Sequence, residues 1–272
     1  MLKVRVLFAL VVTFFISSLP ANAQNTYLGF DRNEYPGDAS LKVLRQTFSY
    51  AGYWLNNPPG ENSNSWVGKR AALESAGFGF LVLFNGRLDK QLRHNAASLG
   101  KVDGQAAILF AQREGFPART IVFLDIEEGG RMLPEQKAYI YAWIDAVNSA
   151  GFHAGVYCSG IPAREDKNTT IVTADDIRNN AQSRQIVYWV TNDVCPPSPG
   201  CAFSSHPPRP AESEIDFADV WQYAQSPRRP DFAAKCHNYN PDGNCYPPGI
   251  NPSTHLFVDV NTANSPDPSA GR

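Results

Sequence analysis

The stretch of sequence that most constrains the fold is a short apolar run that leads directly into a group of carboxylates. Residues 121–124 read Ile-Val-Phe-Leu and are followed by Asp125, Ile126, Glu127, Glu128 and two glycines. A continuous run of apolar, mostly β-branched or aromatic residues is typical of a strand buried on both faces, the kind found in parallel sheets. Because side chains alternate along a strand, Asp125 and Glu127 are expected on one face, with Cα atoms about 6.5–7 Å apart.

Two neighbouring carboxylates at a strand end indicate acid/base chemistry. Repulsion between them raises the pKa of one group, so that one carboxyl keeps its proton while the other stays ionised. Hydrolysis of a glycosidic bond needs such a pair. The same residues also fit a simpler interpretation, in which Asp125 caps the following helix and the glutamates belong to a solvated loop.

The first 23 residues are predicted to be an export signal. Lys3 and Arg5 form a basic start, residues 6–16 an apolar core, and 21–23 a small-x-small cleavage site. The apolar core is shorter than the roughly 20 residues of a membrane span, so we expect a secreted protein, extracellular or periplasmic, with no membrane association after cleavage. The formal net charge of −2 gives no reason to expect nucleic acid as a partner.

The cysteine content agrees with export. Five cysteines in an exported chain predict two disulfides and one free thiol. Cys195 and Cys201 bracket a short Pro-rich loop, and Cys236 and Cys245 bracket a polar loop, so we expect each pair to bond locally. Cys158 lies in an apolar strand pattern and is expected to be a buried free thiol. A histidine beside Cys236 matches no standard zinc spacing, and we expect no metal and no cofactor.

The chain from residue 24 alternates between strand and helix patterns over its first two thirds. Strands are expected at 27–31, 50–55, 78–84, 120–127, 152–157, 186–190, 219–223 and 256–261, and helices near 39–48, 66–76, 103–114, 134–150 and 173–182. Two insertions, 194–214 and 226–254, separate the last strands.

Eight strands, with helices between the first six, predict an α/β fold: an irregular TIM-type (β/α) barrel lacking regular helices between the last strands. We expect a single domain over 24–262 and a disordered tail over 263–272. An open doubly wound sheet is the rival fold, but the first strand is not followed by a Gly-x-Gly-x-x-Gly turn.

Polar side chains recur at the C-terminal ends of the predicted strands, which in a barrel converge on one face. Asp31 and Asp259 belong to the first and last strands and are expected to join Asp125 and Glu127 in one acidic site. Further substrate-binding residues are expected at or beside other strand ends: Tyr53, Trp54, Asn85, Arg87, Glu128, Tyr157, Trp189, Asn192, Asp193, Gln222 and Tyr223. The aromatic members are candidate platforms for sugar rings, and each also fits a role in core packing.

The order of these motifs resembles glycoside hydrolase family 25, the lysozymes that cut peptidoglycan between N-acetylmuramic acid and N-acetylglucosamine. The matching motifs are Gly-Phe-Asp at 29–31, Phe-Leu-Asp-Ile-Glu at 123–127, Gly-Val-Tyr at 155–157, Tyr-Trp-Val at 188–190, Val-Trp-Gln-Tyr at 220–223 and Val-Asp-Val-Asn at 258–261. Residues 29–87 resemble more closely the glycoside-hydrolase-like domain of unknown function, a group of secreted relatives of that family.

The resemblance implies roles for the acidic residues. Glu127 matches the general acid, Asp125 the neighbouring carboxylate, and Asp31 and Asp259 the flanking acids that shape the site. It also implies that the N-acetyl group of the substrate acts as nucleophile. The segments 53–55 and 82–87 and both insertions depart from the usual lysozyme patterns, which leaves the muramic-acid specificity open.

We therefore expect a monomeric, exported glycosidase that acts on peptidoglycan or another N-acetylhexosamine-containing polysaccharide. A catalytically inactive barrel that binds glycans is the main alternative, and a zinc hydrolase is a third. The Asp125–Glu127 pair favours the enzyme, because binding alone does not need a proton donor beside a second acid. The sequence has no His-x-x-x-His helix pattern, which disfavours the zinc hydrolase.

Overall fold

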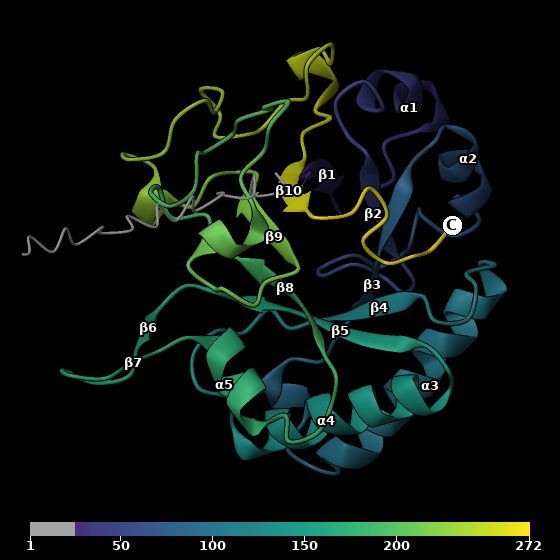
Figure 1. The fold of residues 1–272 in the computed structure, drawn as a ribbon, viewed down its shortest axis with the longest axis vertical. Helices are drawn as coiled ribbons and strands as arrows, with labels where there is room; N and C mark the ends of the chain where they lie inside the picture. Colours follow the sequence, from purple (N-terminus) through teal and green to yellow (C-terminus); the bar gives the residue numbers. More distant parts are fainter. Residues whose placement is uncertain (1–24) are drawn as a thin grey trace, which may run out of the picture.

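The computed structural model describes residues 25–272, and the predicted export signal at 1–23 lies outside the described residues. Eight strands form a closed barrel in the order β1-β10-β9-β8-β5-β4-β3-β2 (Figure 1). Their bounds are β1 Tyr27–Asp31, β2 Tyr50–Trp54, β3 Gly79–Asn85, β4 Ile121–Asp125, β5 His153–Ser159, β8 Val187–Thr191, β9 Val220–Ala224 and β10 Asp259–Ala263. Two short strands, β6 Ala163–Arg164 and β7 Thr170–Ile171, form a hairpin that projects from the barrel. The predicted irregular (β/α) barrel is confirmed.

Strand β10 runs in the opposite direction to the others. It pairs antiparallel with both β9 and β1, whereas the remaining neighbours in the barrel pair in parallel. The prediction that Asp259 ends the last strand is therefore wrong, because Asp259 is the first residue of β10. The reversed direction nevertheless brings it to the same end of the barrel, where it pairs in register with Asp31.

Helices cover the outside of the barrel. Within residues 25–272 the α-helices are α1 Asp38–Leu44, α2 Arg70–Ser75, α3 Ala96–Arg113, α4 Pro134–Ser149 and α5 Thr173–Asn180. Short 3-10 helices lie in the loops: η1 Asp89–Gln91, η2 Pro210–Ser213, η3 Pro230–Phe232 and η4 Pro252–Thr254. Helices α3 and α4 lie side by side along one flank (Figure 1). None of the helices in this part of the chain has the length and apolarity that a bilayer crossing requires.

Helix α3 begins well before its predicted start at residue 103. Gly100 and Gly104 break the helical apolar pattern, which is why the sequence did not indicate its first turns. A Cβ atom at Gly100 would lie 2.2 Å from the Tyr139 carbonyl oxygen, and one at Gly104 would lie 2.8 Å from the Cβ of Ala146. The two glycines therefore allow the backbones of α3 and α4 to approach closely.

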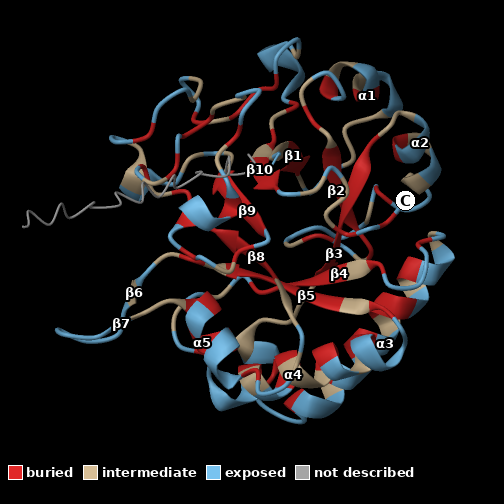
Figure 2. Cartoon of the chain, in the orientation of Figure 1, coloured by how far each residue is buried: buried red, intermediate tan, exposed pale blue. Residues whose placement is uncertain are grey.

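The interior of the barrel is filled by side chains, and the barrel strands are mostly buried, whereas the outer faces of the helices are exposed (Figure 2). Glycines on the strands make room for larger neighbours. A Cβ at Gly155 would lie 2.4 Å from the Phe123 ring, and one at Gly52 would lie 2.6 Å from the Cβ of Asp31. The absence of a side chain at Gly52 thus gives Asp31 its place inside the barrel.

The two insertions between the last strands are joined by disulfides. The bonds are Cys195–Cys236 and Cys201–Cys245, each linking the β8–β9 segment to the β9–β10 segment. The four bonded cysteines were predicted, but the local pairing was wrong. The two insertions pack on each other, and each cysteine of the first insertion bonds to a cysteine of the second. Cys158 is free and buried, as predicted.

The C-terminal residues pack against the start of the sheet. The main chain of Ser269 accepts a hydrogen bond from the Ile121 amide over 2.8 Å and donates one to the Phe80 carbonyl over 2.9 Å. Its hydroxyl accepts from the Val82 amide over 2.8 Å. The predicted disordered tail at 263–272 is therefore wrong. The tail fills the gap between β3 and β4, whose pairing begins only at Val82 and Val122.

Candidate active site

The four predicted acidic residues meet at one end of the barrel. Asp31 ends β1, Asp125 ends β4, Asp259 begins β10, and Glu127 lies in the loop after β4. The side chains of Asp31 and Asp125 are buried, at 7% and 3% exposure, Asp259 is half-buried, and Glu127 is exposed. The carboxyls therefore extend from the buried interior of the barrel to its open mouth.

A network of hydrogen bonds holds Asp31. The Asn261 amide donates to Asp31 Oδ1 over 2.7 Å, and Gln222 Nε2 donates to the same oxygen over 3.0 Å. Gln222 Nε2 also lies 3.4 Å from Asp259 Oδ2, and Gln222 Oε1 accepts from the Tyr157 hydroxyl over 2.8 Å. Side chains from β1, β5, β9 and β10 are thus linked in one network.

An aromatic pair supports this network from below. The rings of Tyr157 and Trp189 lie 4.5 Å apart between centroids, and Trp189 Nε1 donates to Asn261 Oδ1 over 3.0 Å. Only 1% of Trp189 is exposed. Trp189 is therefore part of the floor of the site, and the expectation of an open sugar platform at this residue is wrong.

Asp125 differs from Asp31 in having no such partners. Among residues 25–272, neither of its buried carboxylate oxygens accepts a hydrogen bond of regular geometry. A buried carboxylate without partners is costly, and the neutral form is favoured. Burial first, and then the charges of Glu127 and Asp31, raise the pKa of Asp125 well above its usual range. The Asp125 carboxyl therefore favours its protonated form and lies against the Glu127 carboxyl.

The other three carboxyls are shifted in the same direction. Burial raises the pKa of Asp31 to about 6, against the lowering effect of its bonds from Asn261 and Gln222. Burial, followed by the charge of Asp31, raises the pKa of Asp259. The Glu127 side chain reaches solvent, but its carboxyl is partly desolvated at the mouth, which raises its pKa against the lowering effect of its contact with Asp125. The four groups interact, so the cluster retains protons at a higher pH than isolated carboxyls do.

Two further predicted residues reach the mouth but bond to the protein. Trp54 is buried, and its indole N–H donates to the Arg32 carbonyl over 3.1 Å. Asn85 is the register partner of Asp125, yet its amide donates to the Asn57 carbonyl over 2.9 Å. These side chains shape the wall beside Asp125.

Tyr53 and Tyr223 face away from the site, contrary to prediction. Gly52 lies against Asp31 inside the barrel and Gln222 bonds there too, so the residue after each points outward by strand alternation. Both tyrosines are fully buried. The Tyr53 hydroxyl donates to Glu114, and the Tyr223 hydroxyl donates to a carbonyl of the first insertion.

Arg87 and Glu128 are also occupied by protein partners rather than directed at the site. Arg87 forms a bidentate ion pair with Asp103, in which Nε donates to Oδ2 over 2.6 Å and Nη2 donates to Oδ1 over 2.8 Å. Glu128 accepts from the Asp89 amide over 2.8 Å and from the Gln136 side chain over 2.9 Å. Both residues therefore hold loops at the mouth, and their predicted contact with substrate is corrected.

Asn192 and Asp193 anchor the insertions. The Asn192 amide donates to the Ser213 carbonyl over 2.8 Å. Asp193 is 2% exposed and lies 3.7 Å from an Arg229 guanidinium nitrogen, and burial raises its pKa. Neither side chain is open to a substrate, so the prediction for this pair is also corrected.

Two further residues of the site, Asn261 and Ser226, were not predicted. Asn261 lies two residues after Asp259 on the same strand face, and this period of two could have identified it. The Ser226 amide donates to Asp259 Oδ1 over 2.6 Å. Ser226 lies in an irregular loop, and no sequence pattern indicated this contact.

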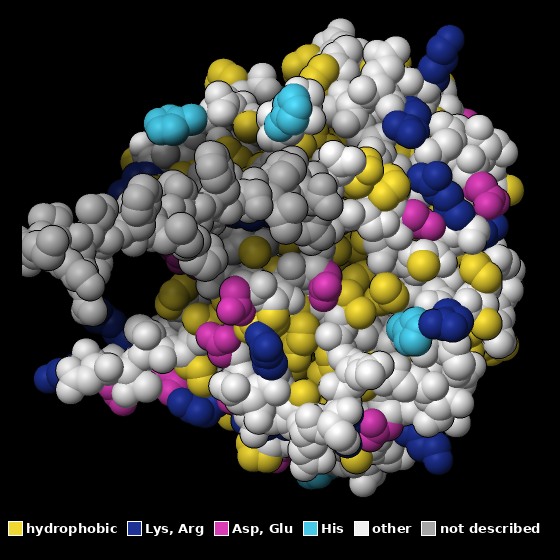
Figure 3. Space-filling view, viewed as in Figure 1, with side chains coloured by type: hydrophobic (Ala, Val, Ile, Leu, Met, Phe, Trp, Pro, Cys, Tyr) yellow, Lys and Arg dark blue, Asp and Glu magenta, His cyan; other side chains and the backbone are white. Residues whose placement is uncertain are grey.

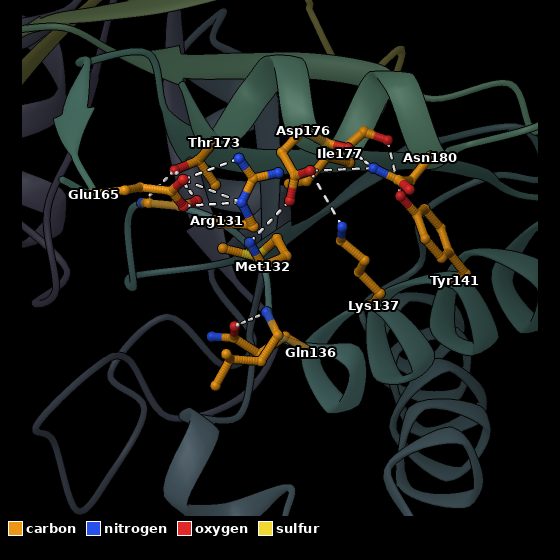
Figure 4. Close-up of polar contacts among 12 residues, drawn as sticks. Arg131, Met132, Gln136, Lys137, Tyr141, Glu165, Thr173, Asp176, Ile177 and Asn180 are labelled. Carbon is orange, nitrogen blue, oxygen red and sulfur yellow. Dashed lines mark hydrogen bonds and ion pairs between the residues drawn. The ribbon is translucent and has the colours of Figure 1, made fainter. Parts of the chain in front are cut away.

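The loop that carries Glu127 is fixed to α5 (Figure 4). Asp176 on α5 accepts from the Met132 amide over 2.9 Å, and Thr173 Oγ1 accepts from the Gly130 amide over 2.8 Å. Acidic side chains lie near the middle of the face seen in Figure 3, with hydrophobic side chains between them.

Among the described residues, no group of three His, Cys, Asp or Glu side chains has an arrangement that could hold a metal ion.

The fold is similar to that of solved proteins. An uncharacterised protein from B. stearothermophilus is 21% identical, with a TM-score of 0.57 over 87% of this chain and 95% of that one. The Tat-secreted protein Rv2525c of Mycobacterium tuberculosis, solved in complex with HEPES, is 16% identical, with a TM-score of 0.52 over 90% of this chain and 97% of that one. Its complex with L-tartrate gives 15% identity and a TM-score of 0.52 over 88% and 95% of the two chains. At these identities the likeness establishes the fold alone.

The family comparison extends this result to the sequence. No curated protein gives a significant match. The family model described as Rv2525c-like, glycoside hydrolase-like domain matches residues 48–198, more than half of the chain. The expected kinship with glycoside-hydrolase-like domains is thereby confirmed, and the chain belongs to the Rv2525c-like, glycoside hydrolase-like domain family.

Proposed function

We propose that the protein is an exported glycosidase that hydrolyses peptidoglycan or another N-acetylhexosamine-containing polysaccharide. The observation that carries this proposal is the interaction of a buried Asp125, to which no backbone amide or cationic side chain of residues 25–272 donates a hydrogen bond, with an exposed Glu127 two residues later at the mouth of the barrel. Membership of a glycoside-hydrolase-like family supports the same class of reaction.

Glu127 is the proton donor in this proposal. It lies at the open mouth, and its raised pKa keeps a proton available for the leaving oxygen. As the bond between the anomeric carbon and that oxygen breaks, the carbonyl oxygen of the substrate's own N-acetyl group bonds to the anomeric carbon. In this proposal the positive charge that develops favours the carboxylate form of Asp125, which releases its proton to solvent and then stabilises that charge. Water then attacks the anomeric carbon, the N-acetyl oxygen leaves, and Glu127 takes up the proton of the water.

Export is part of the proposal. The basic and apolar pattern of residues 1–23 supports a cleaved signal. The disulfides Cys195–Cys236 and Cys201–Cys245 support an oxidising compartment, because such bonds are rare in reducing ones. A polysaccharide outside the cytoplasm would be accessible to the protein there.

The test compares wild type with Glu127→Gln and Asp125→Asn on peptidoglycan, chitin oligomers and a panel of other polysaccharides, with analysis of the released fragments. Glu127→Gln keeps size and hydrogen bonding but removes the proton, so we expect a loss of at least ~10²-fold in rate. Asp125→Asn should cost a comparable factor. Glu165→Gln, in the exposed pair with Arg131, is the matched control and should retain full activity.

Glycan binding is measured on the same proteins. Binding that survives in Glu127→Gln while cleavage is lost supports the assigned role. A wild type that cleaves none of the polysaccharides, with both variants binding glycan as well as it does, would instead establish a glycan-binding barrel.

A further inference from the structure

Two adjacent cavities lie beside the acidic site. The inner cavity has a volume of about 380 Å³ and is lined by Asp259 and Phe257. The outer cavity, of about 510 Å³, lies between α1 and the second insertion. Arg32, Glu34 and His255 line both cavities, which therefore lie next to each other along a line leading away from Asp259, and we call the pair a groove. Each volume falls within the range of about 300–1,000 Å³ found for small-molecule sites.

The lining of this groove combines polar groups with apolar surfaces. Ser40, Asn251 and Thr254 supply hydroxyl and amide groups, and Tyr35 and Leu256 supply apolar surface in the outer cavity. A sugar ring carries hydroxyl groups at its edge and C–H groups on its faces. Hydrogen-bonding groups interspersed with rings and aliphatic side chains are therefore suited to it.

Arg32, in the wall shared by the two cavities, has unused hydrogen-bonding capacity. Its side chain is 13% exposed, and its Nε is buried without a hydrogen-bond partner among the described residues. The carboxylate of Glu34, 70% exposed, is 3.6 Å from the other end of the guanidinium. The guanidinium also lies over the Phe257 ring, 5.9 Å from its centroid. A guanidinium carries five N–H donors, and within residues 25–272 the Arg32 side chain makes no hydrogen bond, so its exposed N–H groups can donate to oxygen atoms of a ligand.

We propose that this groove, named here the Arg32 groove, binds further sugar units of the chain whose bond is cleaved beside Asp125 and Glu127. The protein then recognises a polysaccharide segment rather than an isolated disaccharide. The inference rests on the proposed function, and it adds a substrate-length requirement. Apart from Glu61, the lining residues lie outside the family match at 48–198.

The experiment fills the outer cavity with a bulky side chain. Ala39 is an exposed residue of α1 that lines this cavity, and Ala39→Trp would occupy it without touching the carboxyl cluster. Lys42→Trp, an exposed position of the same helix that does not line either cavity, is the matched control. The probes are chitin oligomers from the dimer upward and glycan fragments of peptidoglycan sorted by length.

For wild type we expect kcat/KM to rise with oligomer length. Ala39→Trp should lower kcat/KM on the longest probes by about tenfold, a loss of about 1.4 kcal/mol of binding, and leave the shortest probe unchanged. Lys42→Trp should behave as wild type throughout. A rate that is independent of length, or an Ala39→Trp variant that matches Lys42→Trp on every probe, would overturn the groove.

Affinity measured by calorimetry keeps the two proposals separable. If wild type binds the probes without cleaving them, an affinity that rises with length and falls in Ala39→Trp still supports the Arg32 groove, while the proposed hydrolysis fails. If the affinity changes neither with oligomer length nor with Ala39→Trp, or if none of the probes binds, the proposed binding of sugar units in the Arg32 groove is contradicted.

Discussion

At the scale of single residues, one amide connects the carboxyls of the site. Gln222 is 2% exposed, donates to Asp31 and Asp259 from its nitrogen, and accepts from Tyr157 at its oxygen. An amide can serve both kinds of partner because it carries donors and an acceptor on one planar group. A glutamate in this position would add a fifth acidic group, and an aliphatic side chain would remove one hydrogen-bond partner from each of Asp31, Asp259 and Tyr157.

Replacing Gln222 by leucine should therefore be strongly destabilising. We expect Gln222→Leu to lower the free energy of unfolding by about 2–3 kcal/mol, because buried partners lose their bonds while the volume is nearly kept. Gln225→Leu is the control, since Gln225 is only half-buried and its bonds to the same network are 3.2 and 3.4 Å long. Urea denaturation should give a loss below about 1 kcal/mol for the control. Equal losses in the two variants would contradict the connecting role of Gln222.

The raised pKa of Asp31 predicts greater stability at mildly acidic pH. Burial raises this pKa from 3.8 to about 6. The folded state then binds the proton more tightly than the unfolded chain, so the contribution is complete below the unfolded pKa and is lost as the pH rises through about 6. Asp125 and Asp259 are shifted in the same direction.

We expect the melting temperature to increase between about pH 7 and pH 4, with a change in unfolding free energy on the order of 2 kcal/mol from Asp31. Asp31→Asn, which keeps an acceptor for Asn261, should have a flatter profile. Thermal melts of both proteins in matched buffers measure the difference. Identical profiles, or a wild type that loses stability throughout this range, would refute the assignment.

At the scale of elements, the loop after β4 depends on its attachment to α5. Asp176 is 5% exposed and accepts from the Met132 amide and from Lys137. The neighbouring Arg131–Glu165 pair is more exposed and links the loop to the β6–β7 hairpin (Figure 4). The buried carboxylate should therefore hold the loop, and with it Glu127, while the exposed pair contributes little.

Asp176→Ala should lower the free energy of unfolding by about 2–3 kcal/mol, because it leaves a buried amide and an ammonium group without their acceptor. Glu165→Ala should cost less than about 1 kcal/mol. Urea denaturation of the two variants tests this ordering directly. A larger effect for Glu165→Ala would mean that the hairpin, and not α5, holds the loop.

The positions of most barrel strands could be predicted from the sequence, because strands buried on both faces have long apolar runs. The run at 121–124 and the acids that follow it therefore gave β4 and the centre of the site. An apolar run does not indicate the direction of the strand, so the antiparallel orientation of β10 was not predicted. The outward orientation of Tyr53 and Tyr223 was missed as well, because a buried aromatic on either face of a strand has the same local pattern.

At the scale of the whole molecule, the two insertions behave as one unit because two disulfides join them. Cys195 and Cys236 are separated by 41 residues, and Cys201 and Cys245 by 44. Long loops closed by a bond restrict the unfolded chain more than short ones do. Local spacing could not have predicted this pairing, since it depends on two irregular segments meeting in space.

Replacing Cys195 and Cys236 together by serine should lower the free energy of unfolding by about 3–4 kcal/mol, from the loop-closure entropy of the bond. Thermal melts of the double variant and of the wild type in reductant provide the measurement. Non-reducing peptide mapping is the control, and it should recover Cys195 linked to Cys236. Recovery of Cys195 linked to Cys201 would show that the disulfides lie within each insertion and do not join the two.

The pairing of β1 with β10 has a consequence for how the chain acquires its site. Asp31 and Asp259 are register partners, yet they lie at opposite ends of the described sequence. During synthesis, β1 cannot pair with β10 until all the segments between them have been made. The acidic cluster is thus completed only after Asp259 has been added to the chain. A chain in which β10 has not yet been made would carry half of the carboxyl pair and no closed barrel around it.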